Sequence, residues 1–206
     1  MKSYLVEFIG TFFLVLVIGL TVIDPGASVF APLAIGGILM VMVYAGGHIS
    51  GGHYNPAVTL AVWMRGKCST GDVLPYMLSQ IAGAGLAALV VGFLKPDAMV
   101  VPGSPDPIRA LLAEALFTFA LCSVVLHVAT SAKTAGNHYF GLAIGFTVFA
   151  GVCAVGGISG AALNPAVAVG VSIMGLASAG NLWIFLVGNF AGAAIAAVVY
   201  KVVNPE

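Results

Sequence analysis

The chain has 206 residues, of which 61% are hydrophobic and only 7% are charged, and its formal net charge is zero. Soluble domains are about one quarter charged, so this composition excludes an ordinary soluble protein and indicates an integral membrane protein. The sequence lacks the basic cluster that would favour nucleic acid as a partner. Its three cysteines lie far apart, which favours neither a disulfide framework nor a metal site.

Six apolar runs have the length of a membrane-spanning helix, about 20 residues. They are expected at residues 4–23, 30–45, 73–94, 108–130, 139–155 and 182–203. Two further apolar runs, 56–64 and 165–174, are too short to cross a bilayer, and each follows a glycine-containing stretch. We expect these two runs to form half-helices. The proline-rich residues 95–107 are expected to connect two halves of the chain without helix.

A short motif divides the chain into two related halves. Asn55-Pro56-Ala57 returns as Asn164-Pro165-Ala166, 109 residues later, which indicates an internal repeat. Each half contains three spans, and an odd number of crossings turns the second half upside down in the membrane. The sequence therefore predicts an all-α membrane protein with six spanning helices and two half-helices that enter from opposite faces. We expect one domain over residues 1–206, with repeats at about 1–95 and 108–206.

The basic residues fix an orientation for this topology. In this topology, one side of the membrane contains Lys2, Arg65, Lys67, Lys133 and Lys201, and the other side contains only Lys95 and Arg109. Because cytoplasmic loops of membrane proteins carry the excess of lysine and arginine, we expect both termini in the cytoplasm. The short termini favour a simple channel in a microbial cytoplasmic membrane.

The repeated motif has the chemistry of a helix start. Asparagine is a favoured N-cap and proline is tolerated at the first helical position. A half-helix that begins at mid-membrane presents unpaired N–H groups and a partial positive charge, which repels cations and protons. Irregular backbone at membrane depth is allowed only where it is buried in protein or lines a water-filled cavity. The carbonyl groups before each motif can therefore offer a line of acceptors to a neutral solute. The expected pore-lining residues are Gly51, Gly52, His53, Tyr54, Gly160 and Ala162.

Several further segments accompany the two motifs. They are Glu7 to Phe12, Gly47 to His53, Gln80 to Gly85, Glu114 to Phe119 and Gly141 to Gly145. With them the whole chain resembles the aquaporins and glycerol facilitators, the major intrinsic protein family. The resemblance implies a pore within each subunit of a homotetramer in lipid, passive conduction of water and small uncharged solutes, and no cofactor.

Two acids inside the expected spans admit two interpretations. Glu7 and Glu114 occupy equivalent places in the repeats, and a carboxylate inside a span is a candidate functional group. A pair of catalytic acids is one interpretation, but Ser50 and Ser159 have no evident base, which argues against an enzyme. The resemblance implies instead that each glutamate accepts hydrogen bonds from a pore loop. His48 is also expected to support the first loop, and no ligand set for a metal accompanies it.

The sequence departs from the family pattern at the outer mouth of the pore. Typical water-selective members have arginine directly after the second motif, where this chain has Val167. By resemblance, the other three positions of the outer filter are Ile35, Val152 and Ala161. An apolar filter without the bulky guanidinium group of arginine and its N–H donors is wider, but it is harder for water to wet. The main cargo is therefore water or, alternatively, another neutral molecule such as ammonia, hydrogen peroxide, a dissolved gas, urea or glycerol. Cys153 adjoins Val152 and is either open to the pore or buried between helices.

Overall fold

The computed structural model describes residues 1–205, and this range is helical without a β-strand. Its α-helices are α1 (Lys2–Val22), α2 (Ala31–Ser50), α3 (Pro56–Met64), α4 (Thr70–Leu94), α5 (Pro107–Ala129), α6 (Phe140–Ser159), α7 (Pro165–Ile173) and α8 (Leu182–Val203). The predicted all-α class is confirmed, and α5 begins at the end of the predicted non-helical connection.

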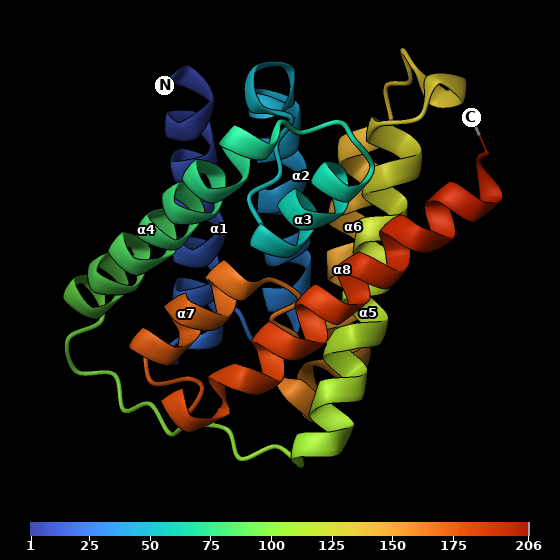
Figure 1. Cartoon of the computed structure of the whole chain (residues 1–206). Coiled ribbons are helices and arrows are strands. Elements are labelled where there is room, and N and C mark those ends of the chain that lie inside the picture. Colours follow the sequence, from blue (N-terminus) through green and yellow to red (C-terminus); the bar gives the residue numbers. More distant parts are fainter. Residues whose placement is uncertain (206) are drawn as a thin grey trace.

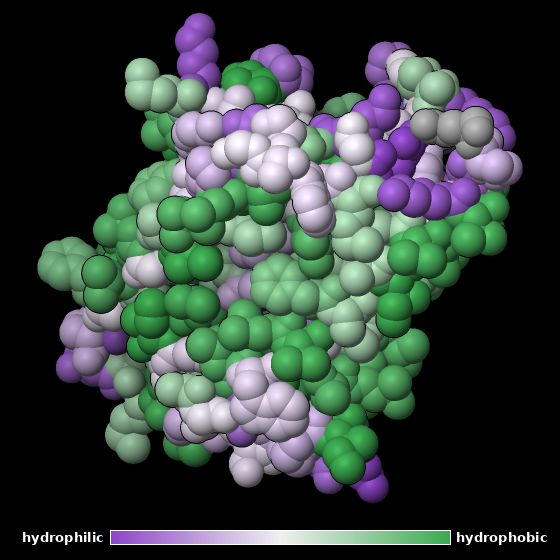
Figure 2. Space-filling model, in the orientation of Figure 1, coloured by the Kyte–Doolittle hydropathy of each residue, from purple (hydrophilic) through white to green (hydrophobic). Residues whose placement is uncertain are grey.

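Six of the helices in the described range are long and apolar enough to span a membrane. The other two, α3 and α7, have nine residues each, a length of about 14 Å that reaches only half way across a bilayer. Figure 1 shows these two half-helices inside the bundle, with both chain ends on the same side of the molecule. Hydrophobic residues cover its middle, and hydrophilic residues gather toward the two ends (Figure 2). The expected inverted arrangement of two halves is confirmed.

Helices α2 and α6 extend further than predicted. The expected ends were Ala45 and Val155, but the helices continue to Ser50 and Ser159. Of the glycines in these last turns, Gly46 serves packing, because a Cβ there would lie 2.0 Å from the Tyr54 hydroxyl oxygen, whereas a Cβ on Gly157 would meet no atom within 4 Å. Each helix ends instead at the next glycine, Gly51 or Gly160, where φ is +91°, a backbone conformation that glycine adopts without steric cost.

Pairs of helices pack closely within each half. In the first half, a Cβ on Gly83 of α4 would lie 2.4 Å from the carbonyl oxygen of Phe8 in α1. In the second half, a Cβ on Gly192 of α8 would lie 2.4 Å from the carbonyl oxygen of Ala115 in α5. Small residues let membrane helices approach backbone to backbone. These contacts hold the walls that surround the two half-helices.

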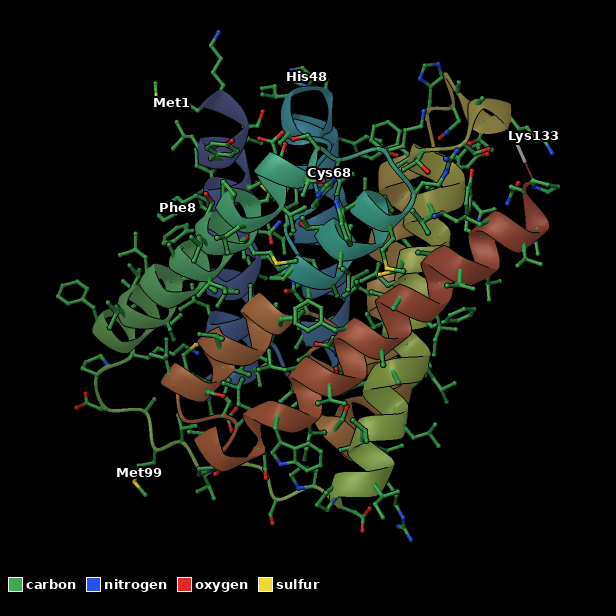
Figure 3. The ribbon with its side chains drawn as sticks, viewed as in Figure 1. Met1, Phe8, His48, Cys68, Met99 and Lys133 are labelled. Carbon is green, nitrogen blue, oxygen red and sulfur yellow. The ribbon has the colours of Figure 1, made fainter. Side chains whose placement is uncertain are left out.

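The connection between the halves is fixed across one end of the bundle. The Lys95 ammonium donates to the carbonyl oxygens of Leu20 and Pro25 at 2.9 and 2.8 Å, and also to that of Ile23. Farther along, Gly103 N donates to Leu176 O at 3.0 Å. Figure 3 places Met99 of this connection at the end opposite to Met1, His48 and Lys133. The connection therefore crosses the face of the bundle near the start of α8.

Candidate pore

The two repeated motifs cap the half-helices that they begin. Asn55 Oδ1 accepts from Ala57 N at 2.8 Å, and Asn164 Oδ1 accepts from Ala166 N at 2.9 Å. Pro56 and Pro165 occupy the first helical positions, where a missing N–H group costs nothing. Both caps are almost fully buried, so both positive helix ends lie inside the protein.

The same two asparagines also join the two halves. Asn55 Nδ2 donates to the carbonyl oxygen of Leu163 at 2.9 Å, and Asn164 Nδ2 donates to the carbonyl oxygen of Tyr54 at 2.9 Å. Each amide thus binds the loop that precedes the opposite motif. An NH2 group has two donors, and each of these bonds uses one of them. The sequence predicted the donors but not these reciprocal bonds.

The two pore loops have the same unusual backbone. Gly52, Tyr54, Ala161 and Leu163 have φ values of +64°, +48°, +50° and +51°. A positive φ is uncommon for residues other than glycine, and it persists where surrounding contacts fix it. The equivalent positions in the two loops differ in side chain but not in conformation. Therefore the loop shape comes from the surrounding contacts rather than from glycine alone.

Glu7 provides those contacts for the first loop. Its Oε1 accepts from Ser50 Oγ at 2.7 Å and from His53 N at 2.9 Å. Its Oε2 accepts from Tyr54 N at 2.6 Å and from Gln80 Nε2 at 2.7 Å. The side chain is completely buried, and a buried carboxylate is tolerated when such bonds compensate for lost water. These contacts support the loop and leave no oxygen directed at a substrate.

Glu114 repeats the arrangement in the second loop. Its Oε1 accepts from Ser159 Oγ at 2.7 Å and Ala162 N at 3.0 Å, and its Oε2 accepts from Leu163 N at 2.7 Å and Asn189 Nδ2 at 2.8 Å. Both carboxylates therefore bind two backbone N–H groups, one serine hydroxyl and one side-chain amide. This repetition favours the supporting role over catalysis.

The amides of Gln80 and Asn189 were missed as supporting groups. They lie 109 residues apart, the same spacing as the two motifs, and this spacing was the signal that could have revealed them. Gln80 Nε2 also donates to Thr59 Oγ1, and Asn189 Nδ2 to Thr118 Oγ1, each at 3.0 Å. Each amide thus joins its glutamate to a second buried helix position.

Two other residues lie where the sequence did not place them. His48 is on α2 with an exposed side chain, so the structure does not bring it against the loop that it was expected to support. The loop is supported there by Ser50, whose hydroxyl group donates to Glu7. The Tyr76 hydroxyl group in turn donates to Ser50 O at 2.8 Å. Cys153 is exposed and is not among the residues that line the pore cavity, because it follows Val152 on another side of α6.

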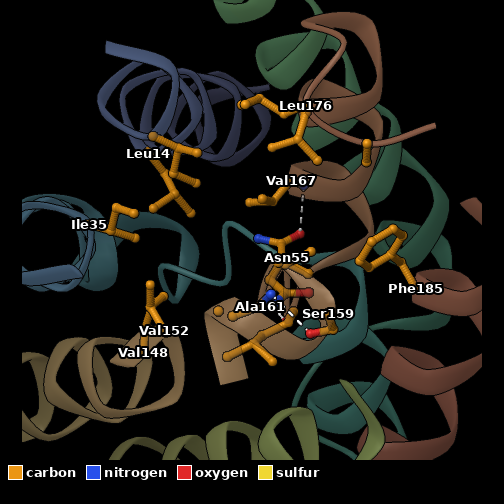
Figure 4. A pocket seen from close by; sticks show the side chains of 18 of the residues that line it. Leu14, Ile35, Asn55, Val148, Val152, Ser159, Ala161, Val167, Leu176 and Phe185 are labelled. Carbon is orange, nitrogen blue, oxygen red and sulfur yellow. Dashed lines mark hydrogen bonds between the residues drawn. The ribbon is translucent and has the colours of Figure 1, made fainter. Parts of the chain in front are cut away.

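A cavity of about 430 Å³ extends to the motifs from the end of the bundle that the connection between the halves crosses; we call this the outer end and the end with both termini the inner end. It is lined by both asparagines and by all four residues carried over as the outer filter: Ile35, Val152, Ala161 and Val167. Figure 4 shows Ile35 and Val152 on one side of the open space and Val167 on the other. Carbonyl-bearing loop residues line the same cavity: Gly52, His53, Tyr54, Gly160, Ala161 and Ala162. The cavity therefore has apolar walls with polar groups concentrated on the loops.

A second cavity of about 490 Å³ opens at the inner end. Its lining includes Gly51, His53, Lys67, Cys68 and Asp72, so charged side chains surround this mouth while the outer cavity lacks them among its lining residues. The two cavities together lead through the described bundle past both half-helix starts. The fold and this path define a membrane channel.

Comparisons with known proteins agree with this class. The model of the family described as major intrinsic protein matches residues 1–200. The chain is 36% identical to "Glycerol uptake facilitator protein-like 6" of Lactiplantibacillus plantarum, over all of both chains. It is 35% identical to "Aquaporin NIP1-4" of Oryza sativa subsp. japonica, covering 99% of this chain and 77% of that one. The chain belongs to the major intrinsic protein family.

A solved structure shows the same fold. The aquaglyceroporin from Plasmodium falciparum superposes with a TM-score of 0.82 at 21% identity, covering 99% of this chain and 97% of that one. Since the family consists of aquaporins and glycerol facilitators, the chain is a passive channel for water and small neutral solutes and not an enzyme. It is a multi-pass membrane protein.

Proposed function

We propose that solutes pass in single file between the two motifs, where Asn55 and Asn164 donate hydrogen bonds and the loop carbonyl groups accept them. The reciprocal bonds from Asn55 to Leu163 O and from Asn164 to Tyr54 O carry this proposal. They hold both positive helix ends at one point of the path, and two such ends oppose the entry of protons and other cations.

The outer filter of this proposal consists of Ile35, Val152, Ala161 and Val167, which line one cavity without a charged side chain among them. Water is the primary cargo. The apolar filter favours a second candidate function, in which ammonia, hydrogen peroxide, a gas, urea or glycerol is the main cargo. The mechanism needs no cofactor.

We further propose one domain over residues 1–206, formed by repeats at about 1–95 and 108–206, in a homotetramer within the cytoplasmic membrane. Both termini would face the cytoplasm. Support for this orientation comes from the basic residues: Lys133 lies at the end of the bundle that carries both termini (Figure 3), and Lys2 and Lys201 lie close to those termini in the sequence.

Stopped-flow measurements on purified protein in liposomes test the function and separate the two cargo classes. Water permeability from shrinkage in impermeant osmolyte is compared with the permeabilities of glycerol, urea and ammonia, and protein-free liposomes give the lipid background. A water permeability well above that background supports the first candidate. Background water permeability together with rapid flux of one of the other solutes would support the second candidate and reject the first.

A further inference from the structure

In each half, the residue that caps the third spanning helix binds the end of the first spanning helix. The cap residues are Lys95 after α4 and Asn204 after α8, which lie 109 residues apart like the two motifs. Their backbone angles agree, with φ of −128° and −126° and ψ of 60° and 66°. The Lys95 ammonium donates to Leu20 O near the end of α1 at 2.9 Å, and Asn204 Nδ2 lies 3.2 Å from His127 Nε2 near the end of α5. The repeat thus places the same attachment at opposite ends of the bundle.

The two attachments differ in their acceptors. At the outer end, all three N–H donors of the Lys95 ammonium bind backbone carbonyl oxygens. At the inner end, the acceptor is an imidazole nitrogen, and histidine is the side chain whose charge changes between pH 5 and 8. Only the inner attachment therefore depends on an acceptor that a proton can remove.

The contacts fix which nitrogen of the His127 ring accepts. Its Nδ1 lies 2.7 Å from Ser123 O, and because a carbonyl oxygen only accepts, Nδ1 carries a hydrogen atom. The Asn204 NH2 group is oriented by a second bond, to Tyr200 O at 3.2 Å. Its other N–H group points at Nε2, which is therefore the unprotonated acceptor. A proton on Nε2 would place a donor against a donor.

The surroundings of this imidazole are basic. The guanidinium carbon of Arg65 lies 4.8 Å from the centroid of the Tyr200 ring, and the imidazole centroid lies 4.9 Å from the same ring. A protonated His127 would thus share one aromatic ring with a second cation. Helices α3 and α8 and the loop 130–139 contain no acidic residue that could pair with it. The other titratable side chains of α8 and this loop are exposed: Lys133, His138, Tyr139 and Lys201.

We propose that His127 and Asn204 form a proton-sensitive latch, which attaches the C-terminal end of α8 to α5 while the imidazole is neutral and releases it in acid. Ala129 and Thr130, which follow His127, line the inner cavity. The latch therefore adjoins the inner mouth, at the end of the bundle that carries both termini (Figure 1). This inference goes beyond the proposed conduction and does not depend on it.

Release should be confined to the end of α8. The loop after α5 is attached to the same turn of that helix by other bonds, from Thr134 Oγ1 to His127 O and from Asn137 Nδ2 to Val128 O. Their acceptors are carbonyl oxygens, which protonation of the imidazole does not remove. The loop therefore stays in place when the latch opens.

Hydrogen–deuterium exchange of residues 201–204 in the detergent-solubilised protein tests the latch. Asn204→Ala removes the donor and leaves the imidazole, and comparison with wild type at the same pH cancels the intrinsic pH dependence of exchange. At pH 8, we expect exchange about fivefold faster in the variant, the factor that one net hydrogen bond represents. At pH 5, the two proteins should exchange equally. The last turn of α4 before Lys95 is the internal control and should not differ between them at either pH. No difference at pH 8, or the same difference at pH 5, would overturn the proposal.

Two further variants separate the latch from simple packing. His127→Phe keeps a ring beside Tyr200 but takes up no proton, so it should exchange like Asn204→Ala at both pH values, whereas exchange like wild type at pH 8 would refute the acceptor. Asn204→Asp replaces the donor with a carboxylate that binds the protonated imidazole, so its protection relative to Asn204→Ala should rise from pH 8 to pH 5. If His127→Phe does not fold, this variant decides: protection that fails to rise refutes the latch. None of these measurements uses solute flux, so failure of the proposed conduction would be recognised separately.

Discussion

The isopropyl group of Val167 occupies the position where a long cationic side chain would narrow the outer mouth. It is buried in the first turn of α7 and lines the outer cavity opposite Ile35 and Val152. Val167→Arg would add bulk and a donor fork at this point. We expect the variant to lower glycerol and urea permeability severalfold relative to water. Unchanged flux ratios in stopped-flow measurements would show that this position does not face the path, and Val167→Met provides the control for bulk without charge.

Each carboxylate oxygen of Glu114 already accepts two hydrogen bonds. Glu114→Gln places an NH2 group where two donors already point, either Ser159 Oγ and Ala162 N or Leu163 N and Asn189 Nδ2. Unpaired buried donors cost about 1–3 kcal/mol, so the midpoint of thermal unfolding in detergent should fall. Glu7→Gln should lower it by a similar amount. If neither midpoint changes, the hydrogen bonds to these acids do not stabilise the loops.

The cysteines differ in access to the path. Cys68 lines the inner cavity, Cys122 is buried, and Cys153 is exposed but does not line the outer cavity. A thiol reagent bound at Cys68 should therefore block water flux, and Cys68→Ser should abolish this inhibition while Cys153→Ser preserves it. The opposite pattern in stopped-flow assays would contradict the assigned positions.

The rate of this modification should depend on pH. Partial burial, and then the nearby Asp72 carboxylate, raise the pKa of the Cys68 thiol above its ordinary value. Since the thiolate is the reactive form, less of it is present at neutral pH than for a free cysteine. The rate of inhibition should rise as pH increases through and beyond the usual thiol range, and a rate that levels off near pH 8 would disagree with the raised pKa. A small free thiol provides the reference.

At the scale of elements, α2 and α6 cross at a pair of glycines. A Cβ on Gly36 would lie 2.6 Å from Gly145 O, whereas a Cβ on the neighbouring Gly37 would meet no atom within 4 Å. Gly36→Ala should destabilise the protein by about 1–3 kcal/mol because the two helices must separate. Gly37→Ala is the matched control and should unfold at the wild-type temperature or slightly above it. Equal effects of the two substitutions would exclude a tight crossing here.

The helices could be predicted from the sequence because each follows from local composition and length. The half-helices were the clearest case: Asn before Pro specifies a cap, and nine apolar residues are too few to span a membrane. The C-terminal ends of α2 and α6 were predicted too early. A glycine such as Gly46 locally favours the end of a helix. Here the position is glycine because the Tyr54 side chain occupies the space that a Cβ would need, and this long-range contact is not visible in the local sequence.

At the scale of the whole molecule, the repeat predicted which residues would be equivalent but not which atoms would meet. The motif spacing placed Asn55 and Asn164 at one level, and the structure adds that each binds the opposite loop. Likewise, the role of Gln80 appears only when α4 is packed beside Glu7. Such contacts join residues dozens of positions apart, and their geometry depends on how all the helices pack together. The candidate filter was recognisable by resemblance, whereas the single cavity that its four residues line together appears only in the folded chain.

The electrostatic barrier is a property of the whole molecule, because it needs both halves. Two half-helix starts meet at the motifs, so their partial positive charges add at one point of the path. Wild-type protein in liposomes should therefore show proton flux no greater than protein-free liposomes, measured with an internal pH dye and valinomycin. Proton conductance well above the lipid background would contradict the barrier.

Charge at this point can be changed while the cap geometry is kept. Asn164→Asp retains a good N-cap but loses the donor to Tyr54 O and adds a negative charge against the helix starts. Asn164→Ala loses the same donor and also the cap without adding charge, so it is the control for loss of the amide. We expect the aspartate variant to conduct protons faster than the alanine variant, since the carboxylate cancels part of the positive field. Equal proton flux in the two variants would mean that the barrier depends on the shape of the junction rather than on its charge.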